Sequence, residues 1–173
     1  MTQKPVKLIL KTLMVHENMS KPLVLVFAGP NGSGKSTITK LLPQCGVYVN
    51  ADDLKKEYSL TDTERNLLLL RKAKENGYEI YCIYVLTCHA DINVARVRSR
   101  VCEGGHDVAE DKIRSRYIKA LELLPQIINV CDKILVYDNS TVPLLIFKKD
   151  EEGNNYFPTD LWSVEKLKDL LKH

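Results

Sequence analysis

The sequence lacks the features that mark membrane and secreted proteins. No apolar run approaches the ~20 residues that a membrane-spanning helix needs. The N-terminal apolar stretch at residues 6–15 is interrupted by Lys7 and Lys11, and no small-residue cleavage site follows it, so a signal peptide is not expected. We therefore expect a cytoplasmic protein with no membrane partner.

The sequence also has few cysteines and a small net charge. The five cysteines are odd in number and show no close pairing, which argues against a disulfide framework or a metal site and favours reduced, packed thiols. Lysine and arginine exceed aspartate and glutamate by only three charges, too few to indicate nucleic-acid binding. The 173 residues are enough for one domain with a real core.

Apolar runs alternate with helical patterns along most of the chain. Neither pattern is strong before Pro22, so we interpret residues 1–21 as an N-terminal extension, with Met19 as an alternative start, and residues 22–173 as the domain. The predicted strands are residues 23–28, 47–49, 80–86 and 133–137. The predicted helices are residues 36–42, 61–76, 91–102, 108–128 and 161–171. Residues 144–148 and 156–157 are expected to form a small C-terminal hairpin around residues 153–154.

Continuous apolar, β-branched runs are typical of strands buried on both faces of a parallel sheet. Their alternation with helices predicts an α/β fold, in which helices flank a parallel sheet of about four to five strands.

A glycine-rich loop follows the first predicted strand. Residues 29–37 read Gly-Pro-Asn-Gly-Ser-Gly-Lys-Ser-Thr and lie between a strand and a helix, the context expected of a phosphate-binding loop, or P-loop. The glycines allow the backbone N–H groups to point inward at phosphate oxygens, Lys35 would reach the β- and γ-phosphates, and Ser36 would bind Mg²⁺. The cofactors expected are ATP and Mg²⁺. The predicted nucleotide-binding residues are Gly29, Pro30, Asn31, Gly32, Ser33, Gly34, Lys35, Ser36 and Thr37.

The rest of the sequence favours a small kinase among P-loop NTPases. It contains no Asn-Lys-x-Asp guanine-binding motif and is too short for a motor or transporter ATPase. Asp52 and Asp53 follow the strand predicted at residues 47–49, where a carboxylate can accept the proton of a hydroxyl or hold Mg²⁺ through water. Aspartate at this place is equally good as a helix N-cap, and position alone leaves both roles open.

Four arginines and one histidine are candidates for a lid over the phosphates. Two arginines lie four residues apart on one helix, two more follow on the next helix, and a double glycine connects the helices. The alternative is a solvated basic face paired with nearby carboxylates, with the histidine as an ordinary loop residue. The candidates are Arg96, Arg100, Arg114, Arg116 and His106.

Several stretches together resemble the zeta toxin family, in particular its short bacterial members. They occur in the family's order across about residues 23–147. The matching stretches are the loop at residues 29–37, Asn-Ala-Asp at 50–52, Arg-Val-x-x-Arg-Val at 96–101, Gly-Gly-His-Asp-Val at 104–108, Ile-Arg-Ser-Arg-Tyr at 113–117 and Tyr-Asp-Asn-Ser at 137–140. The last three are more specific than the loop, which many kinases share.

The resemblance implies an ATP-dependent kinase that transfers phosphate to a sugar-nucleotide hydroxyl, that of UDP-N-acetylglucosamine in the best-known members, usually opposed by a small antitoxin. Lys35 and Ser36 would bind phosphate and Mg²⁺, and Asp52 would be the general base. Arg100 and Arg116 would be lid arginines that contact the phosphates during catalysis, with Arg96 and Arg114 as further members.

The chain departs from this family at one place. Family members carry a helix and a strand ending in Phe-x-Glu-Thr after the Asn-x-Asp motif, and residues 58–66 leave no room for either. The acidic residue of that strand helps to position Mg²⁺ and the acceptor. We therefore expect a kinase-like protein with reduced activity or, alternatively, a catalytically inactive nucleotide-binding module that acts through a partner. The acceptor is left open.

Overall fold

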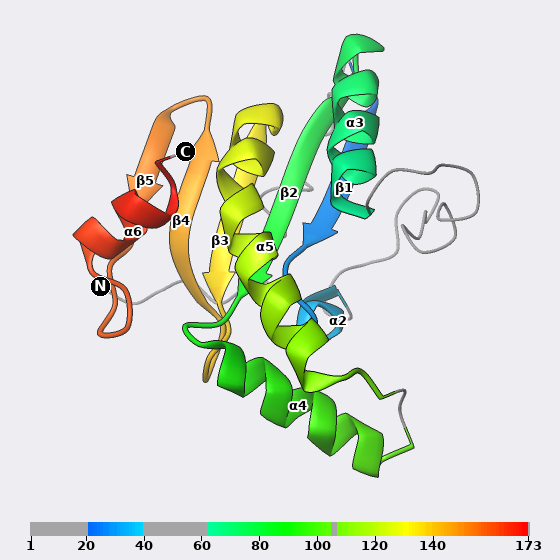
Figure 1. The fold of residues 1–173 in the computed structure, drawn as a ribbon. Coiled ribbons are helices and arrows are strands. Elements are labelled where there is room, and N and C mark those ends of the chain that lie inside the picture. The colour runs from blue at the N-terminus through cyan, green and yellow to red at the C-terminus, as the bar shows by residue number, and fades with distance from the viewer. Residues whose placement is uncertain (1–20, 40–61, 105–106, 173) are drawn as a thin grey trace.

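The computed structural model describes residues 21–39, 62–104 and 107–172, which form one sheet with helices packed on it (Figure 1). The strands are β1 (Leu23–Ala28), β2 (Glu79–Leu86), β3 (Lys133–Asp138), β4 (Leu144–Asp150) and β5 (Gly153–Tyr156). The helices are α2 (Lys35–Thr39), α3 (Asp62–Glu75), α4 (Ala90–Cys102), α5 (Glu110–Val130) and α6 (Val164–Leu170). The strand predicted at residues 47–49 and the extension at residues 1–20 lie outside the described residues.

The α/β fold is confirmed, and its sheet is mixed: the expected parallel arrangement holds for three strands, and the two strands of the C-terminal hairpin are antiparallel. The strand order is β1-β2-β3-β4-β5. Strands β1, β2 and β3 run parallel, whereas β4 and β5 are antiparallel to their neighbours. Residues 139–143, which join β3 to β4, are far too few for the crossover of about a dozen residues that a parallel pair requires. The predicted hairpin exists as β4 and β5 and extends the main sheet, but it turns at residues 151–152 and not around residues 153–154, which belong to β5.

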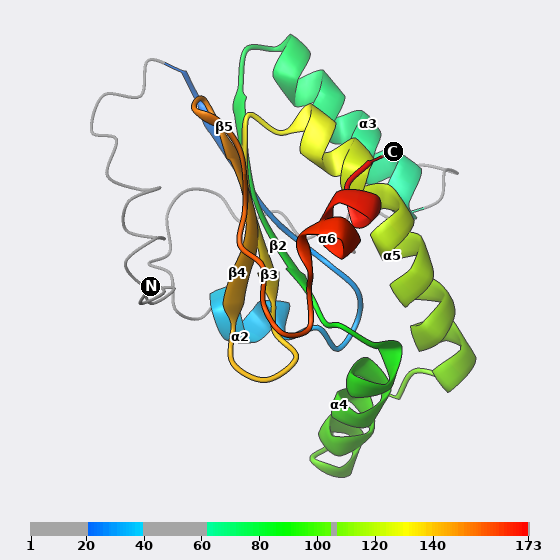
Figure 2. The same ribbon diagram turned by 90° about the vertical axis from the view of Figure 1, so that its left-hand side faces the viewer.

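The two faces of the sheet are covered by different elements. Helices α3, α5 and α6 pack on one face, and α2 lies on the other (Figure 2). Strand β2 shows the alternation expected of a strand buried on both sides. Cys82 and Tyr84 face α5 and α6, while Ile83 and Val85 face Ile38 of α2. Burial on both faces explains why β2 reads as a continuous apolar run.

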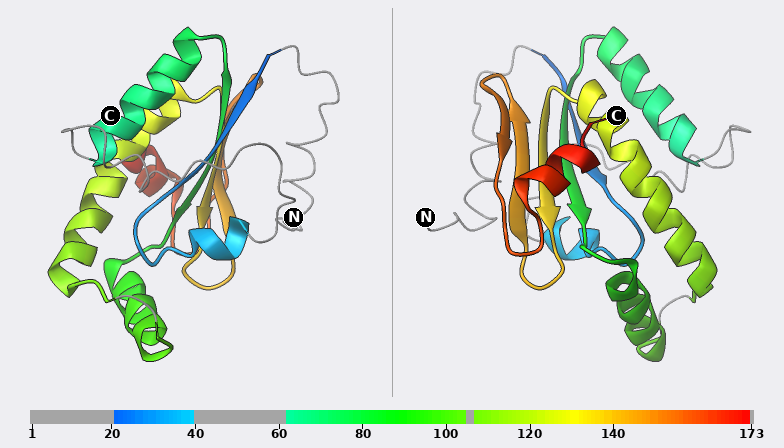
Figure 3. Two further views of the ribbon diagram at one scale, coloured as in Figure 1. Left: turned by 90° about the vertical axis from the view of Figure 1, so that its right-hand side faces the viewer. Right: turned by 60° about the vertical axis from the view of Figure 1, so that its left-hand side comes forward.

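The parallel strands bring three connections to one edge of the sheet. The glycine-rich loop follows β1, residues 87–89 follow β2, and residues 139–143 follow β3. Helices α2 and α4 begin at this edge (Figure 3). Ligands of open α/β sheets bind outside the carboxyl ends of the strands, so this edge positions the candidate site.

Hydrogen bonds fix the ends of β2 and β3 to each other at this edge. The N–H of Asn139 donates to the carbonyl of Leu86 at 2.8 Å. The N–H of Cys88 donates to Ser140 Oγ at 2.8 Å, and that hydroxyl donates to Asp138 Oδ1 at 2.5 Å. The two connections therefore form one rigid support beside the glycine-rich loop.

The remaining sequence expectations concern cysteines and membrane spans. The cysteines in the described ranges are free; Cys82 and Cys131 are buried as expected, whereas Cys102 at the end of α4 is exposed. The described residues contain no cluster of three or more His, Cys, Asp or Glu side chains placed to hold a metal ion. No helix in residues 21–39, 62–104 or 107–172 is long and apolar enough to span a membrane.

Tyr117 links α5 to the end of β2, and its loss should be measurable. Its buried hydroxyl donates to the carbonyl of Thr87 at 2.7 Å. We expect Tyr117→Phe to lower the free energy of unfolding by about 1 kcal/mol, because the buried carbonyl loses its donor. Tyr78→Phe is the control, since Tyr78 is 41% exposed. Equal unfolding midpoints of the two variants in urea would contradict this assignment.

Candidate functional site

Two glycines of the loop at residues 29–37 pack too tightly for any side chain. Gly29 has a φ of 134°, and a Cβ there would lie 1.9 Å from the carbonyl oxygen of Val85 in β2. Gly34 has a φ of 91°, and its Cβ would lie 2.2 Å from Asn139 Nδ2. Both positions require glycine for the backbone conformation and for the close approach. The loop is therefore seated directly on the ends of β2 and β3.

The loop presents several unused backbone donors. The only backbone hydrogen bonds that the structure describes between loop residues run from Ser33 N to Pro30 O at 3.3 Å and from Thr37 N to Gly34 O at 3.1 Å. The N–H groups of Gly32, Gly34, Lys35 and Ser36 donate to no acceptor in the described part of the chain. Successive free N–H groups in a tight turn form a concavity that binds anions.

Lys35 lies against the same loop. Its ammonium donates to the carbonyls of Gly29 at 2.7 Å and Pro30 at 3.0 Å. Burial lowers the pKa of Lys35 to about 8, because desolvation disfavours the charged form. The side chain is still mostly protonated at pH 7, so it adds a positive charge to the unused N–H groups.

Two buried side-chain amides hold the loop from outside. Asn93 of α4 donates to the carbonyl of Asn31 at 2.6 Å and accepts a hydrogen bond from the hydroxyl of Thr87. Asn139, which follows β3, donates to the carbonyl of Ser33 at 2.8 Å. These amides tie the loop to two other elements of the fold.

Arg96, a candidate for the lid, contacts the loop from the side of α4. Its guanidinium donates to the carbonyls of Asn139 at 2.7 Å and Ser140 at 3.2 Å, and it lies 3.5 Å from the carbonyl of Ser33. The structure thus brings Arg96 to the predicted loop, where it braces the loop against the end of β3.

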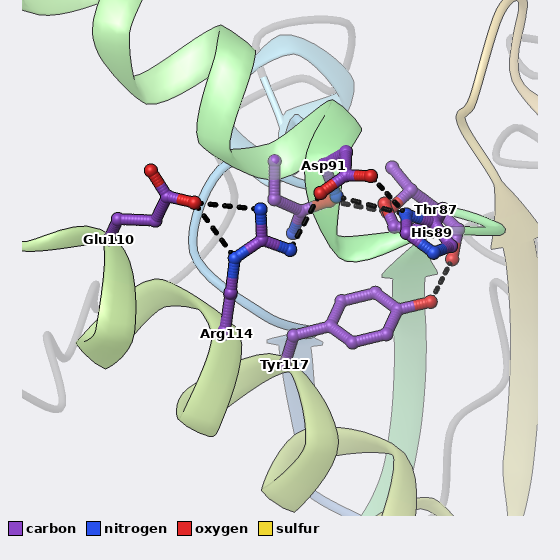
Figure 4. A network of polar contacts seen from close by, with 7 residues as sticks. Thr87, His89, Asp91, Glu110, Arg114 and Tyr117 are labelled. Atoms are coloured by element: carbon purple, nitrogen blue, oxygen red, sulfur yellow. Dashed lines mark hydrogen bonds and ion pairs between the residues drawn. The ribbon is translucent and has the colours of Figure 1, made fainter.

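Arg114 instead joins α4 to α5, as Figure 4 shows. Its guanidinium bonds Asp91 at the start of α4 at 2.6 Å and Glu110 at the start of α5 at 2.7 Å. His89 lies 2.9 Å from the same aspartate. The hydrogen bond from Arg114, reinforced by the charges of Arg114 and His89, lowers the pKa of Asp91. This arrangement fits the alternative of a basic face paired with carboxylates.

The remaining predicted site residues are either exposed or outside the described ranges. Arg100 lies exposed near the end of α4, and Arg116 lies exposed on α5, where it makes no ion pair with any described residue. Ser36 and Thr37 are exposed at the start of α2, next to Lys35. Asp52 and His106 lie outside the described residues.

Sequence reasoning missed Asn93 and did not single out Asn139 from the Tyr-Asp-Asn-Ser stretch. Asn93 lies three residues before Arg96, so both occupy one face of α4, the face turned to the loop. This spacing is the signal that was available. Asn139 belongs to no periodic pattern, and only the fold shows that it meets Gly34.

The fold and the loop define an α/β protein with a candidate anion-binding site at the carboxyl edge of its parallel strands. A curated protein of Haemophilus influenzae, named only as an uncharacterized protein, is 42% identical to this chain over 48 residues, which are 28% of this chain. The match spans about a third (34%) of that relative's length. No protein-family model matches the chain, and no solved structure matches it.

Proposed function

We propose that this chain binds ATP with Mg²⁺ at the loop of residues 29–37. The observation that carries the proposal is the group of unused N–H donors at Gly32, Gly34, Lys35 and Ser36, with the Lys35 ammonium on the same loop. Backbone donors and a lysine in this arrangement suit a chain of phosphates, which offers several anionic oxygens in a row.

The residues present also fit Mg²⁺. The Ser36 side chain is exposed directly after Lys35, where its hydroxyl oxygen would be a ligand of Mg²⁺. Bound Mg²⁺ would supply neutralisation of the phosphate charge. Lys35 would hold the phosphates, and the amides of the loop would orient them.

Phosphoryl transfer to a hydroxyl of a sugar-nucleotide-type acceptor is the reaction that the resemblance implies. The acceptor oxygen would form a bond to the γ-phosphorus, and the bond from that phosphorus to the bridging oxygen would break. The hydroxyl proton would pass to a carboxylate, for which the resemblance proposes Asp52. The acceptor class and an antitoxin partner are parts of this proposal.

A nucleotide-binding module without catalysis is the second candidate. It is favoured by the contacts of Arg96 and Arg114, which brace the loop and join two helices instead of projecting toward a ligand. A module of this kind would act through a partner protein that recognises the nucleotide-bound form.

An assay of acceptor-dependent ADP formation separates the two candidates. We expect wild-type protein with Mg²⁺ and ATP to release ADP faster when UDP-N-acetylglucosamine is added, and Asp52→Ala to lose the increase. Binding of ATP without acceptor-dependent ADP would instead support the module. An increase that survives Asp52→Ala would remove Asp52 as the base.

The lowered pKa of Lys35 predicts a pH dependence of anion binding. A bound anion favours the charged ammonium, so above the free pKa of about 8 binding must take up a proton. The affinity for ATP should fall about tenfold or more between pH 7.5 and pH 9.5, a range above the last ionisation of its γ-phosphate. Titration calorimetry measures both the affinity and the proton uptake. In Lys35→Arg, whose guanidinium stays charged, the residual affinity should not change with pH. A flat wild-type profile would contradict the assignment.

A further inference from the structure

The carbonyls held by Asn93 and Asn139 fix the direction of particular N–H groups in the loop. A trans peptide unit is planar, and its carbonyl points away from the N–H of the next residue. Because Asn93 binds the carbonyl of Asn31, the N–H of Gly32 points away from α4. Because Asn139 binds the carbonyl of Ser33, the N–H of Gly34 points away from the end of β3. Both N–H groups belong to the set that has no acceptor among the described residues.

A second hydrogen bond fixes the orientation of the Asn93 amide, and Asn139 is held at its backbone. Asn93 is fully buried, and its oxygen accepts from the hydroxyl of Thr87, which leaves its nitrogen to face the loop. Asn139 is 7% exposed, and its own backbone N–H is held by the carbonyl of Leu86. Neither side chain can turn away without leaving a buried polar group unpaired, which is costly.

The two asparagines also approach the loop where only glycine fits, Asn139 with its side chain and Asn93 with its backbone. The position of a Cβ on Gly34 lies 2.2 Å from Asn139 Nδ2, and that of a Cβ on Gly32 lies 2.6 Å from the backbone oxygen of Asn93. The glycines thus let α4 and the end of β3 reach the backbone carbonyls directly. The close contacts at the glycines and the hydrogen bonds from the amides therefore stabilise the same conformation of the loop.

We propose that Asn93 and Asn139 are positioning residues that aim the N–H groups of Gly32 and Gly34 at the phosphates of a bound nucleotide. The inference rests on the proposed function, because it assigns these two residues a role in that binding. Neither amide needs to touch the ligand. Their effect is to hold two donors in the binding direction before the anion arrives, so that binding does not have to order them.

Asn139→Asp is the sharpest test, because it keeps the size of the side chain and replaces the donor by an acceptor. The carboxylate then faces the carbonyl of Ser33, and the peptide unit keeps only its long contact of 3.5 Å with the Arg96 guanidinium. We expect at least about tenfold weaker binding of tripolyphosphate, the effect of one misdirected hydrogen bond to a charged group. Asn93→Asp should weaken the binding of tripolyphosphate to a similar extent. Asn76→Asp is the matched control, because the exposed Asn76 amide donates to the carbonyl of Lys72 at 2.7 Å on α3, away from the loop.

A spectroscopic readout separates positioning from general loss of structure. In the wild type, tripolyphosphate should shift the amide proton resonances of Gly32 and Gly34 strongly. In Asn139→Asp the shift of Gly34 should shrink, while resonances of β2 and α5 stay where they are. If Asn139→Asp does not fold, Asn139→Ala removes the donor without adding a charge, and the same result is expected.

The outcomes distinguish this inference from the proposed function. A wild-type protein that binds tripolyphosphate as tightly as its Asn93 and Asn139 variants overturns the inference alone. A wild-type protein that binds no tripolyphosphate overturns the proposed function and this inference with it. Weaker binding in both variants, unchanged binding in Asn76→Asp and a reduced Gly34 shift support it.

Discussion

Replacement of Lys35 by alanine is expected to weaken the binding of tripolyphosphate and of ATP by about 100-fold. The ammonium lies on the loop, within hydrogen-bonding distance of the carbonyls of Gly29 and Pro30, next to the unused N–H groups. A hydrogen bond between charged groups contributes about 1.5–3 kcal/mol, and a partly desolvated lysine that meets two phosphates makes more than one. Each 1.4 kcal/mol changes affinity about tenfold, which gives the expected factor.

Lys119→Ala is the matched control for this experiment. Lys119 is exposed on α5, so its removal takes away the same charge at a distance from the loop. Isothermal titration calorimetry of the two variants and the wild type should show a large loss for Lys35→Ala only. Equal affinity of Lys35→Ala and wild type would show that the loop is not the site, and equal losses in both variants would indicate non-specific electrostatic attraction.

Gly29→Ala should give the largest loss of stability of any substitution in the loop. At a φ of 134° an alanine is strained, and its Cβ would lie 1.9 Å from a backbone oxygen of β2, which cannot move without disturbing the sheet. Strain of this kind costs about 1–3 kcal/mol, and the clash adds to it. We expect the free energy of unfolding to fall by about 4 kcal/mol or more.

Gly77→Ala is the control for this loss. It measures the cost of the backbone conformation alone, so the difference between the two variants is the cost of the clash. Gly77 also has a positive φ, 81°, but a Cβ there would meet nothing within 4 Å. We expect a loss of about 1 kcal/mol, from backbone conformation alone. Urea unfolding of both variants measures the difference. A Gly29→Ala protein no less stable than Gly77→Ala would contradict the seating of the loop on β2.

The sequence predicted most strands well because their signal is local. The runs at residues 80–86 and 133–137 differ from β2 and β3 by a single residue at one end, and residues 23–28 coincide with β1. Burial on both faces makes such strands continuously apolar, which can be read without knowing their neighbours. The C-terminal hairpin was predicted without its place in the main sheet, because that place depends on β4 pairing with β3 across the short connection at residues 139–143.

The candidate site also has one part that the sequence predicts and another that only the fold shows. The loop at residues 29–37 could be predicted because its glycines, lysine and serine are consecutive. The roles of Arg96 and Arg114 could not, because spacing along a helix gives the face that they share but not what that face meets. Arg96 meets carbonyls of the loop region, and Arg114 meets Asp91 and Glu110. The predictions for Asp52 and His106 remain predictions, since both residues lie outside the described ranges.

The binding of Mg²⁺ and ATP to the wild-type protein, measured by isothermal titration calorimetry at pH 7.5, tests the central claim most directly. We predict saturable binding of one nucleotide per chain with a dissociation constant below about 1 mM, equivalent to at least about 4 kcal/mol. Tripolyphosphate should compete for the same site, because the contacts assigned to the loop are contacts to phosphate. The absence of saturable binding, or binding of ATP with which tripolyphosphate does not compete, would contradict the account.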